Sequence, residues 1–151
     1  MSNYITDFKK LYNKRINMSK NMDKKDVVGI GNAIVDIITN DTDEFLHTNN
    51  IKKSSMKLCN EKESEELYNQ IKPKIQMSGG SAANTIAGIA NLGGKTNFIG
   101  KLHNDIFGKI FLEDLKLLGI QHNIKLSDQG KTTAKCIVIV TPDAQRSLVT
   151  Y

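Results

Sequence analysis

Two short stretches of the chain carry residues that could bind hydroxyl groups. Residues 78–94 read SGGSAANTIAGIANLGG, so Gly79 and Gly80 precede a small-residue helix that carries Asn84 near its start. Glycine lets a ligand approach the backbone closely, and a helix start offers unpaired N–H donors. The side-chain amide of Asn84 can both donate and accept hydrogen bonds. Close packing of the helix on a sheet is the structural alternative.

The second stretch is the apolar segment VVGIGNAIVDII, residues 27–38, which contains Asn32 and Asp36. A carboxylate is costly to bury among apolar residues unless it is paired. We therefore expect Asp36 to meet a polar ligand, or to lie at a strand end where it caps the following turn. An ionised aspartate can accept two hydroxyl hydrogen bonds, which is the chemistry needed to hold the diol of a sugar.

Two near matches to nucleotide-binding motifs fail on their spacing. Gly29 and Gly31 begin a dinucleotide fingerprint, but its third glycine would fall at Ile34. The segment GIANLGGKT, residues 88–96, has one residue too many for a phosphate-binding loop and follows a predicted helix instead of a strand. Neither segment is interpreted as a nucleotide site.

The elements that must position these residues alternate between strands and helices. We expect strands at residues 27–38, 96–100, 136–141 and 147–151, the last two joined as an antiparallel hairpin through Pro142 and Asp143. We expect helices within residues 41–52, 60–71, 81–92 and 105–119, with Asp105 as the cap of the last one. This alternation predicts an α/β fold with at least partly parallel pairing.

Composition indicates a soluble protein. The 151 residues are 39% hydrophobic and 25% charged, which suits one globular domain. No apolar run is long enough for a membrane helix, and the polar N-terminus lacks a secretory signal, so we expect no membrane association. Cys59 and Cys136 match no metal-site spacing and predict reduced thiols in a cytoplasmic protein.

Most of the net charge of +5 lies in residues 1–26, which predict a basic, flexible extension with Met18 and Met22 as alternative starts to Met1. The remainder is nearly neutral, which argues against a nucleic-acid partner. The histidines, His47, His103 and His122, are interpreted as surface or hydrogen-bonded structural residues, and no metal site is predicted. Lys101 could approach an anion but is interpreted as a solvated side chain.

Several segments together resemble the ribokinase-like (PfkB-type) carbohydrate kinases, and most closely their adenosine kinase-like branch. They are GNAIVDI at 31–37, SGGSAANTIAGIANLGG at 78–94, FIGKLHNDIFGKIFLEDLKLLGI at 98–120 and TAKCIVIVTPDAQRSLVTY at 133–151. They occur in the family's order, so residues 27–151 resemble the N-terminal portion of its kinase domain, lid strands included.

The resemblance implies an α/β fold with a central, mostly parallel sheet, flanking helices and a small β-sheet lid. It implies transfer of a phosphoryl group from ATP, with Mg²⁺, to a hydroxymethyl group of a sugar or nucleoside. Ile34 and the strand near Cys136–Val138 would form apolar walls around the substrate. The residues that match the family's substrate site are Asn32, Asp36, Gly79, Gly80 and Asn84.

One departure from the family is large. Its catalytic segment, a GAGD-like run that supplies the general base, has no match in residues 1–151, and neither have its ATP-binding loops. No catalytic residue is therefore assigned. We expect a truncated chain that is inactive alone, binds neither ATP nor Mg²⁺ by itself, and pairs with a C-terminal half or with itself through lid strands. A non-catalytic module that binds a small ligand or dimerises is the alternative. Adenosine, ribose and fructose stay open as substrates.

Overall fold

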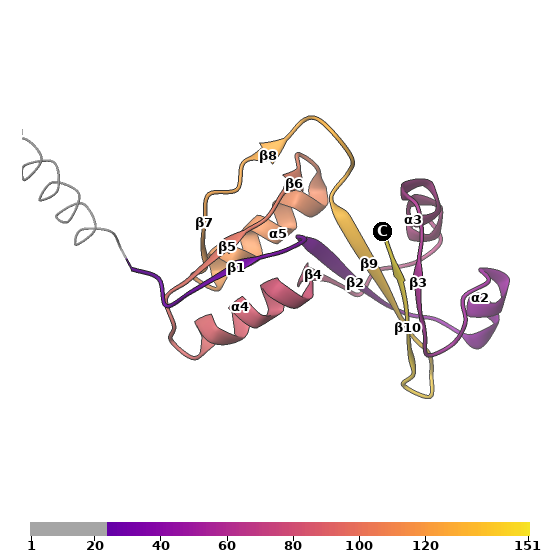
Figure 1. Cartoon of the computed structure of the whole chain (residues 1–151). Helices are drawn as coiled ribbons and strands as arrows, with labels where there is room; N and C mark the ends of the chain where they lie inside the picture. The colour runs from indigo at the N-terminus through magenta and orange to yellow at the C-terminus, as the bar shows by residue number, and fades with distance from the viewer. Residues whose placement is uncertain (1–23) are drawn as a thin grey trace, which may run out of the picture.

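The computed structural model describes residues 24–151, so the predicted extension, residues 1–26, falls outside it except for the last three residues. The described chain has an α/β architecture, as predicted (Figure 1). Its strands are β1 (Val27–Ile30), β2 (Ile34–Asn40), β3 (Met56–Leu58), β4 (Ile75–Gly79), β5 (Thr96–Ile99), β6 (Leu102–His103), β7 (Gln121–His122), β8 (Leu126–Ser127), β9 (Ala134–Val140) and β10 (Arg146–Thr150). Its helices are α2 (Asp43–Thr48), α3 (Glu61–Tyr68), α4 (Ser81–Asn91) and α5 (Ile106–Leu117).

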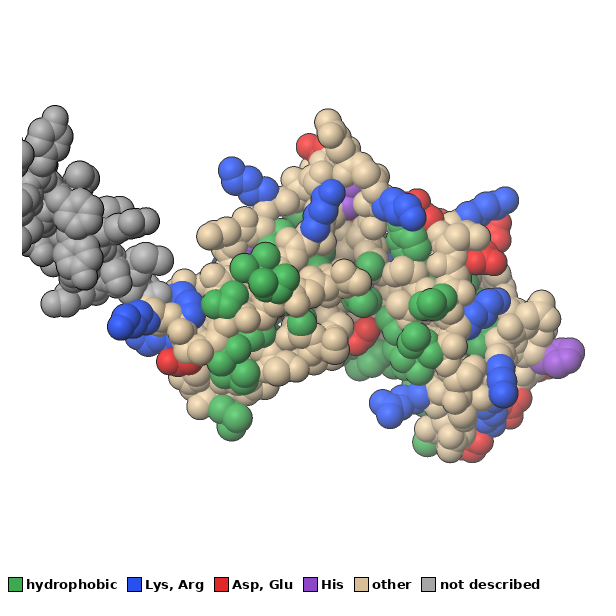
Figure 2. Space-filling model, viewed as in Figure 1, with side chains coloured by type: hydrophobic (Ala, Val, Ile, Leu, Met, Phe, Trp, Pro, Cys, Tyr) green, Lys and Arg blue, Asp and Glu red, His purple; other side chains and the backbone are tan. Residues whose placement is uncertain are grey.

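Strands β1, β5 and β7 form a parallel three-stranded sheet with β5 in the centre. Helices α4 and α5 both pack on the same face of it. Ile86 of α4 lies against Gly29, and Phe111 of α5 lies 5.5 Å, ring to ring, from Phe98, the register partner of Gly29. The opposite face leaves large apolar side chains exposed, which Figure 2 shows as green atoms over β1 and β5; they are Val28, Ile30 and Ile99.

A second, mixed sheet has the order β3-β10-β9-β2-β4. Strands β9 and β10 form the predicted antiparallel hairpin, and β2 runs parallel to β9. Helices α2 and α3 lie on one side of this sheet (Figure 1), where Leu46 and Leu67 belong to the buried core. Buried side chains of the sheet face that side; they are Val35, Ile37, Ile137, Ile139 and Val149.

Two expectations about strands are corrected. Residues 27–38 were expected to form one strand, but the chain leaves the first sheet after Ile30 and enters the second at Ile34. Gly31 permits this crossing, because a Cβ there would clash with Ala82 of α4. The edges of the hairpin strands, expected to be free for pairing with another chain, are both covered, since β3 pairs with β10 and β2 pairs with β9.

Local signals set the helix ends. Thr42, Asn60 and Asp105 each accept a backbone hydrogen bond in the first turn of α2, α3 and α5, and Asn60 belongs to a complete capping box. Helix α4 ends as predicted: Gly93 has a positive φ of 88°, and Gly94 donates to the carbonyl of Ile89. Among the described residues, no helix combines the length and the apolar character needed to cross a bilayer.

Candidate functional site

Asp36 lies in the middle of β2 on the face of the five-stranded sheet that α2 and α3 leave open. Side chains along β2 alternate between the two faces, so Ile34, Asp36 and Ile38 share the open face while their neighbours are buried. The register places Met77 of β4 on one side of Asp36 and Cys136 of β9 on the other. The alternative position for Asp36, at a strand end, is therefore wrong.

The Asp36 carboxylate is partly buried in an apolar setting. Burial raises its pKa above the usual aspartate range. In the part of the chain that the structure describes, no hydrogen bond or ion pair holds this carboxylate. Burial also raises the pKa of the neighbouring Cys136 thiol, and the charge of Asp36 adds to that rise. A desolvated carboxylate with free acceptor positions is suited to receive hydrogen bonds from a ligand.

The glycine pair, Gly79 and Gly80, leaves room for the Asp36 carboxylate. A Cβ added to Gly79 would clash with both carboxylate oxygens of Asp36. Gly80 has a positive φ of 92°, and a Cβ there would lie 3.0 Å from the carbonyl oxygen of Asn32. Gly80 is also the N-cap of α4 and provides no side-chain cap, so the first turn of this helix keeps unpaired N–H groups.

The five predicted site residues come from three segments that meet at this point. Asp36 contacts Gly79, the Asn32 carbonyl faces Gly80, and Asn84 donates its backbone N–H to the Gly80 carbonyl at 2.9 Å. The side chains of Asn32 and Asn84 are exposed. The packing alternative is also realised, because Ala83 and Ile86 of α4 are buried against the sheet. Helix α4 therefore serves both purposes: it packs on the sheet through Ala83 and Ile86, and its first turn lies at the open face that carries Asp36.

Next to Asp36 the open face forms an apolar hollow of about 420 Å³. Its lining residues are Asp36, Ile38, Val138, Val140, Arg146 and Leu148. Val138 was predicted as an apolar wall and lines the hollow, whereas Ile137 faces the buried core. Arg146 was missed by the sequence interpretation. Arg146 could have been found from β10, because every second side chain of a strand lies on the same face. Arg146 therefore shares a face with Leu148, and it lies opposite Val140 of β9.

Other sequence interpretations have mixed outcomes. Asp105 caps α5, accepting from Gly108 N at 2.7 Å, and also accepts from Thr133 N at 2.8 Å. The Nδ1 atoms of His103 and His122 are buried without a hydrogen-bond partner, so the expectation of satisfied or surface histidines is wrong for these two. Residues 24–151 contain no group of three or more His, Cys, Asp or Glu that could hold a metal ion.

The sequence model of the pfkB family of carbohydrate kinases matches residues 24–151, which includes both sheets and the Asp36 site. The chain belongs to the pfkB family. Its resemblance to ribokinase-like carbohydrate kinases is thereby confirmed. Two solved structures have its fold with a TM-score of 0.76 each. A probable sugar kinase from Rhizobium etli CFN 42 is 42% identical, and an adenosine kinase from Sinorhizobium meliloti is 44% identical.

The similarity to these family members covers different lengths. The two solved structures match 86% and 85% of this chain, which spans 39% of each of them. Among curated relatives, the fructokinase of Solanum tuberosum is 35% identical over 77 residues, which are 51% of this chain and 24% of that protein. The pfkB chain thus spans about a quarter of this curated relative and about two fifths of the solved kinases.

Proposed function

We propose that this chain provides the substrate-binding part of an ATP-dependent kinase that phosphorylates a hydroxymethyl group of a nucleoside or sugar. The observation that carries the proposal is the Asp36 carboxylate, which is partly buried, lies against Gly79 and borders the apolar hollow. A carboxylate in that setting is available for a ligand that brings its own hydrogen-bond donors.

Asp36 would accept hydrogen bonds from two hydroxyl groups of the substrate. Gly79 and Gly80 carry no side chain and would let the sugar ring approach the backbone, and Gly79 also leaves the space that the Asp36 carboxylate occupies. The unpaired N–H groups at the start of α4 and the amides of Asn32 and Asn84 would serve as further partners for hydroxyl oxygens.

The hollow favours a nucleoside over a free sugar. Its walls include Ile38, Val138 and Leu148, and its volume of about 420 Å³ exceeds what a pentose alone would fill. An aromatic base on the anomeric carbon would cover these apolar side chains. The similarity to an adenosine kinase supports this choice, whereas the similarity to fructokinases supports a sugar. We therefore propose that adenosine binds more tightly than ribose or fructose.

The phosphoryl donor in this proposal is ATP with Mg²⁺, as the family resemblance implies. Within residues 24–151 there is no group of three or more His, Cys, Asp or Glu that could hold a metal ion. We place the metal, the general base that accepts the hydroxyl proton and the ATP site on a polypeptide segment outside these 151 residues. The role of this chain is then to bind and orient the acceptor hydroxyl, and alone it would not consume ATP.

Calorimetric titration of the 151-residue chain with adenosine, ribose and fructose tests this proposal. We expect saturable binding with adenosine tightest, and a loss of about tenfold or more in Asp36→Asn, because a hydrogen bond to a charged group contributes about 1.5–3 kcal/mol. Glu113→Gln, an exposed acid on α5, is the matched control and should bind like the parent. Equal affinity in the parent and in Asp36→Asn would contradict the proposed site.

A further inference from the structure

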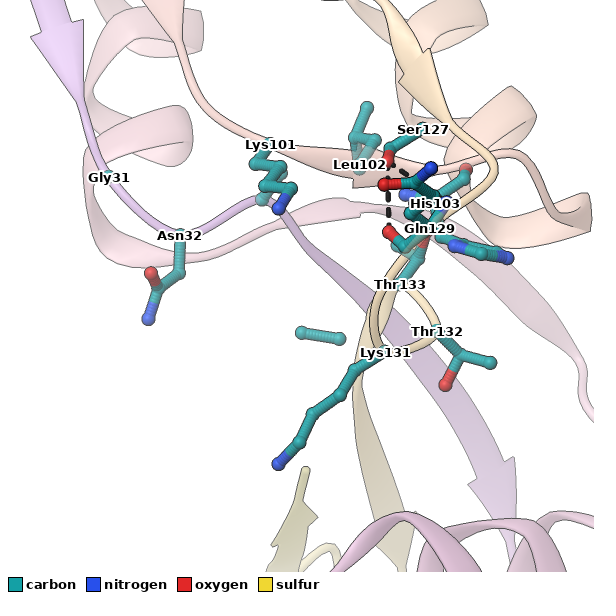
Figure 3. A pocket seen from close by; sticks show the side chains of 12 residues that line it. Gly31, Asn32, Lys101, Leu102, His103, Ser127, Gln129, Lys131, Thr132 and Thr133 are labelled. Atoms are coloured by element: carbon teal, nitrogen blue, oxygen red, sulfur yellow. Dashed lines mark hydrogen bonds between the residues drawn. The ribbon is translucent and has the colours of Figure 1, made fainter.

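A second cavity, of about 350 Å³, lies where the crossing between the two sheets meets the loop that precedes β9 (Figure 3). Three backbone segments line it: residues 31–33, residues 101–103, and residues of the 127–134 loop. The hollow beside Asp36 shares no lining residue with it. The predicted substrate residue Asn32 stands at its border, so the two sites are neighbours.

The ionisable side chains that line this cavity belong to two lysines, Lys101 and Lys131, and to His103. Lys101, Lys131 and Asn32 come from three different segments and border the same open space (Figure 3). No carboxylate lines the cavity. Within residues 24–151, neither lysine forms an ion pair or a side-chain hydrogen bond.

Three carboxylates lie next to the cavity lining and accept hydrogen bonds from backbone, hydroxyl or amide donors; they are Glu61, Asp105 and Asp128. Glu61 accepts from the backbone N–H of Thr132 at 3.1 Å and from its hydroxyl at 2.7 Å. Those two bonds chiefly lower the pKa of Glu61, and the charge of Lys131 adds a smaller effect. Asp128 accepts from the amide of Asn104 at 2.7 Å. These carboxylates keep their negative charge, and that of Glu61 interacts with Lys131, but within residues 24–151 none of them forms an ion pair with Lys101 or Lys131.

His103 is the third ionisable side chain in the cavity lining, and one of its two ring nitrogens is closed to solvent. His103 lines the cavity, its backbone N–H donates to the Thr133 hydroxyl at 3.1 Å, and its Nδ1 is buried without a partner. Buried polar atoms are rarely left unsatisfied in folded proteins. The other ring nitrogen, Nε2, can donate to an anion, so His103 can supplement the two ammonium groups.

We propose that this cavity binds a phosphate group. Two ammonium groups at one cavity repel each other, and a dianionic group between them replaces that repulsion with two charge-assisted hydrogen bonds. The imidazole of His103 supplies a neutral donor for a further oxygen. A metal cation is disfavoured because the lining offers positive charge and no carboxylate. The site is distinct from the hydroxyl-binding role proposed for Asp36 and does not depend on it.

The test compares charge-matched variants of the 151-residue chain. Inorganic phosphate is titrated at constant ionic strength while the backbone amide resonances are followed by NMR. We expect saturable shifts centred on residues 101–103 and 131–133, and about tenfold weaker binding when both lysines are replaced, Lys101→Gln with Lys131→Gln. Lys109→Gln with Lys116→Gln removes the same charge from exposed positions of α5 and should leave phosphate binding unchanged.

Two outcomes would overturn the proposal: shifts that rise linearly without saturation, or equal weakening in both double variants. A parallel titration with ribose 5-phosphate and ribose separates the two sources of the phosphate group. Binding of ribose 5-phosphate at least about tenfold tighter than inorganic phosphate would assign the group to a phosphorylated sugar, the type of product that the proposed reaction forms. Equal binding would assign it to a free anion, and both results support the phosphate site. Adenosine binding should be the same in both double variants, which keeps this test separate from the Asp36 site.

Discussion

The carboxylate of Asp36 lies directly against the Cα of Gly79, on the strand paired with its own. Gly79 is the register partner of Ile34, so Asp36 reaches diagonally across the sheet into the space where a side chain would otherwise stand. This contact joins the two stretches, GNAIVD and SGGSAAN, that lie more than 40 residues apart in the sequence. The Asp36 carboxylate can take this position only because residue 79 has no side chain.

Gly79→Ala should therefore displace the Asp36 carboxylate. We expect the free energy of unfolding to fall by about 1–3 kcal/mol, as is usual for overpacking, and adenosine binding to weaken about tenfold or more. Gly88→Ala is the control within the adjoining helix, because a Cβ there meets nothing within 4 Å. It should leave binding unchanged and stabilise the chain by about 0.5–1 kcal/mol. Urea denaturation and calorimetry measure both effects, and equal losses in the two variants would contradict the contact.

Asp36→Asn should make the free chain more stable at neutral pH. Burial raises the pKa of Asp36, so the folded chain binds this proton more tightly than the unfolded chain does, and stability falls as the pH rises through that interval. The substitution removes this loss. Its stabilising effect in urea denaturation should shrink as the pH is lowered from about 7 to about 4. A variant that is less stable than the parent at neutral pH would mean that the carboxylate has a stabilising partner.

Lys135 is a buried cation, and substitutions can distinguish the contribution of its ion pair from that of its apolar packing. Its side chain is 1% exposed, its Nζ lies 3.2 Å from a Glu65 carboxylate oxygen, and the rings of Tyr68 and Phe107 lie 5.8 and 5.0 Å from it. Glu65→Gln leaves the ammonium buried without its counter-charge, and we expect a loss of about 1–3 kcal/mol. Lys135→Met keeps the volume and removes the charge, so we expect a loss below about 1.5 kcal/mol.

Glu66→Gln provides the control for the Lys135 series, since Glu66 pairs with Lys62 at the surface at 3.8 Å. Surface pairs of this kind contribute between nothing and about 1 kcal/mol. Thermal and urea unfolding of the three variants should rank Glu65→Gln as the least stable. If Lys135→Met proved the most damaging, the ion pair itself would be the stabilising feature.

Asp143 in the hairpin turn should stay ionised in moderately acidic solution. Its hydrogen bonds with Lys53 and Thr141 lower its pKa to about 2. The ionised form stabilises the fold above the ordinary aspartate range, and this contribution is lost as the pH falls toward about 2. Lys53→Met should move the titration of Asp143, followed by carboxyl carbon NMR, toward the ordinary value. Lys52→Met should not, and an unchanged titration in Lys53→Met would contradict the pairing.

Much of the fold was predictable because local signals and periodicity determine it. Asp105 and the Gly93–Gly94 pair mark helix ends through their own hydrogen bonds, and the run of β-branched residues in β9 identifies a strand without tertiary information. The glycine pair and Asp36 were singled out for the same reason: an isolated carboxylate and two adjacent glycines are unusual in apolar segments. Their meeting at one point is a tertiary fact that the resemblance anticipated.

What could not be predicted depends on how the strands pair. The break between β1 and β2 falls at Gly31 and Asn32, residues that permit a turn, but the sequence does not show that the two halves of this apolar run belong to different sheets. Arg146 reaches the hollow only because β10 pairs with β9 in one register. Lys101 and Lys131 come together only because the loop before β9 passes over the end of β5, which no local pattern records.

The most direct test of the central claim is calorimetric titration of adenosine into the folded 151-residue chain and its Asp36→Asn variant, with circular dichroism to verify that both have the same fold. We expect saturable binding to the parent and at least about tenfold weaker binding to the variant. A folded parent that does not bind adenosine, ribose or fructose, or a variant that binds as well as the parent, would contradict it.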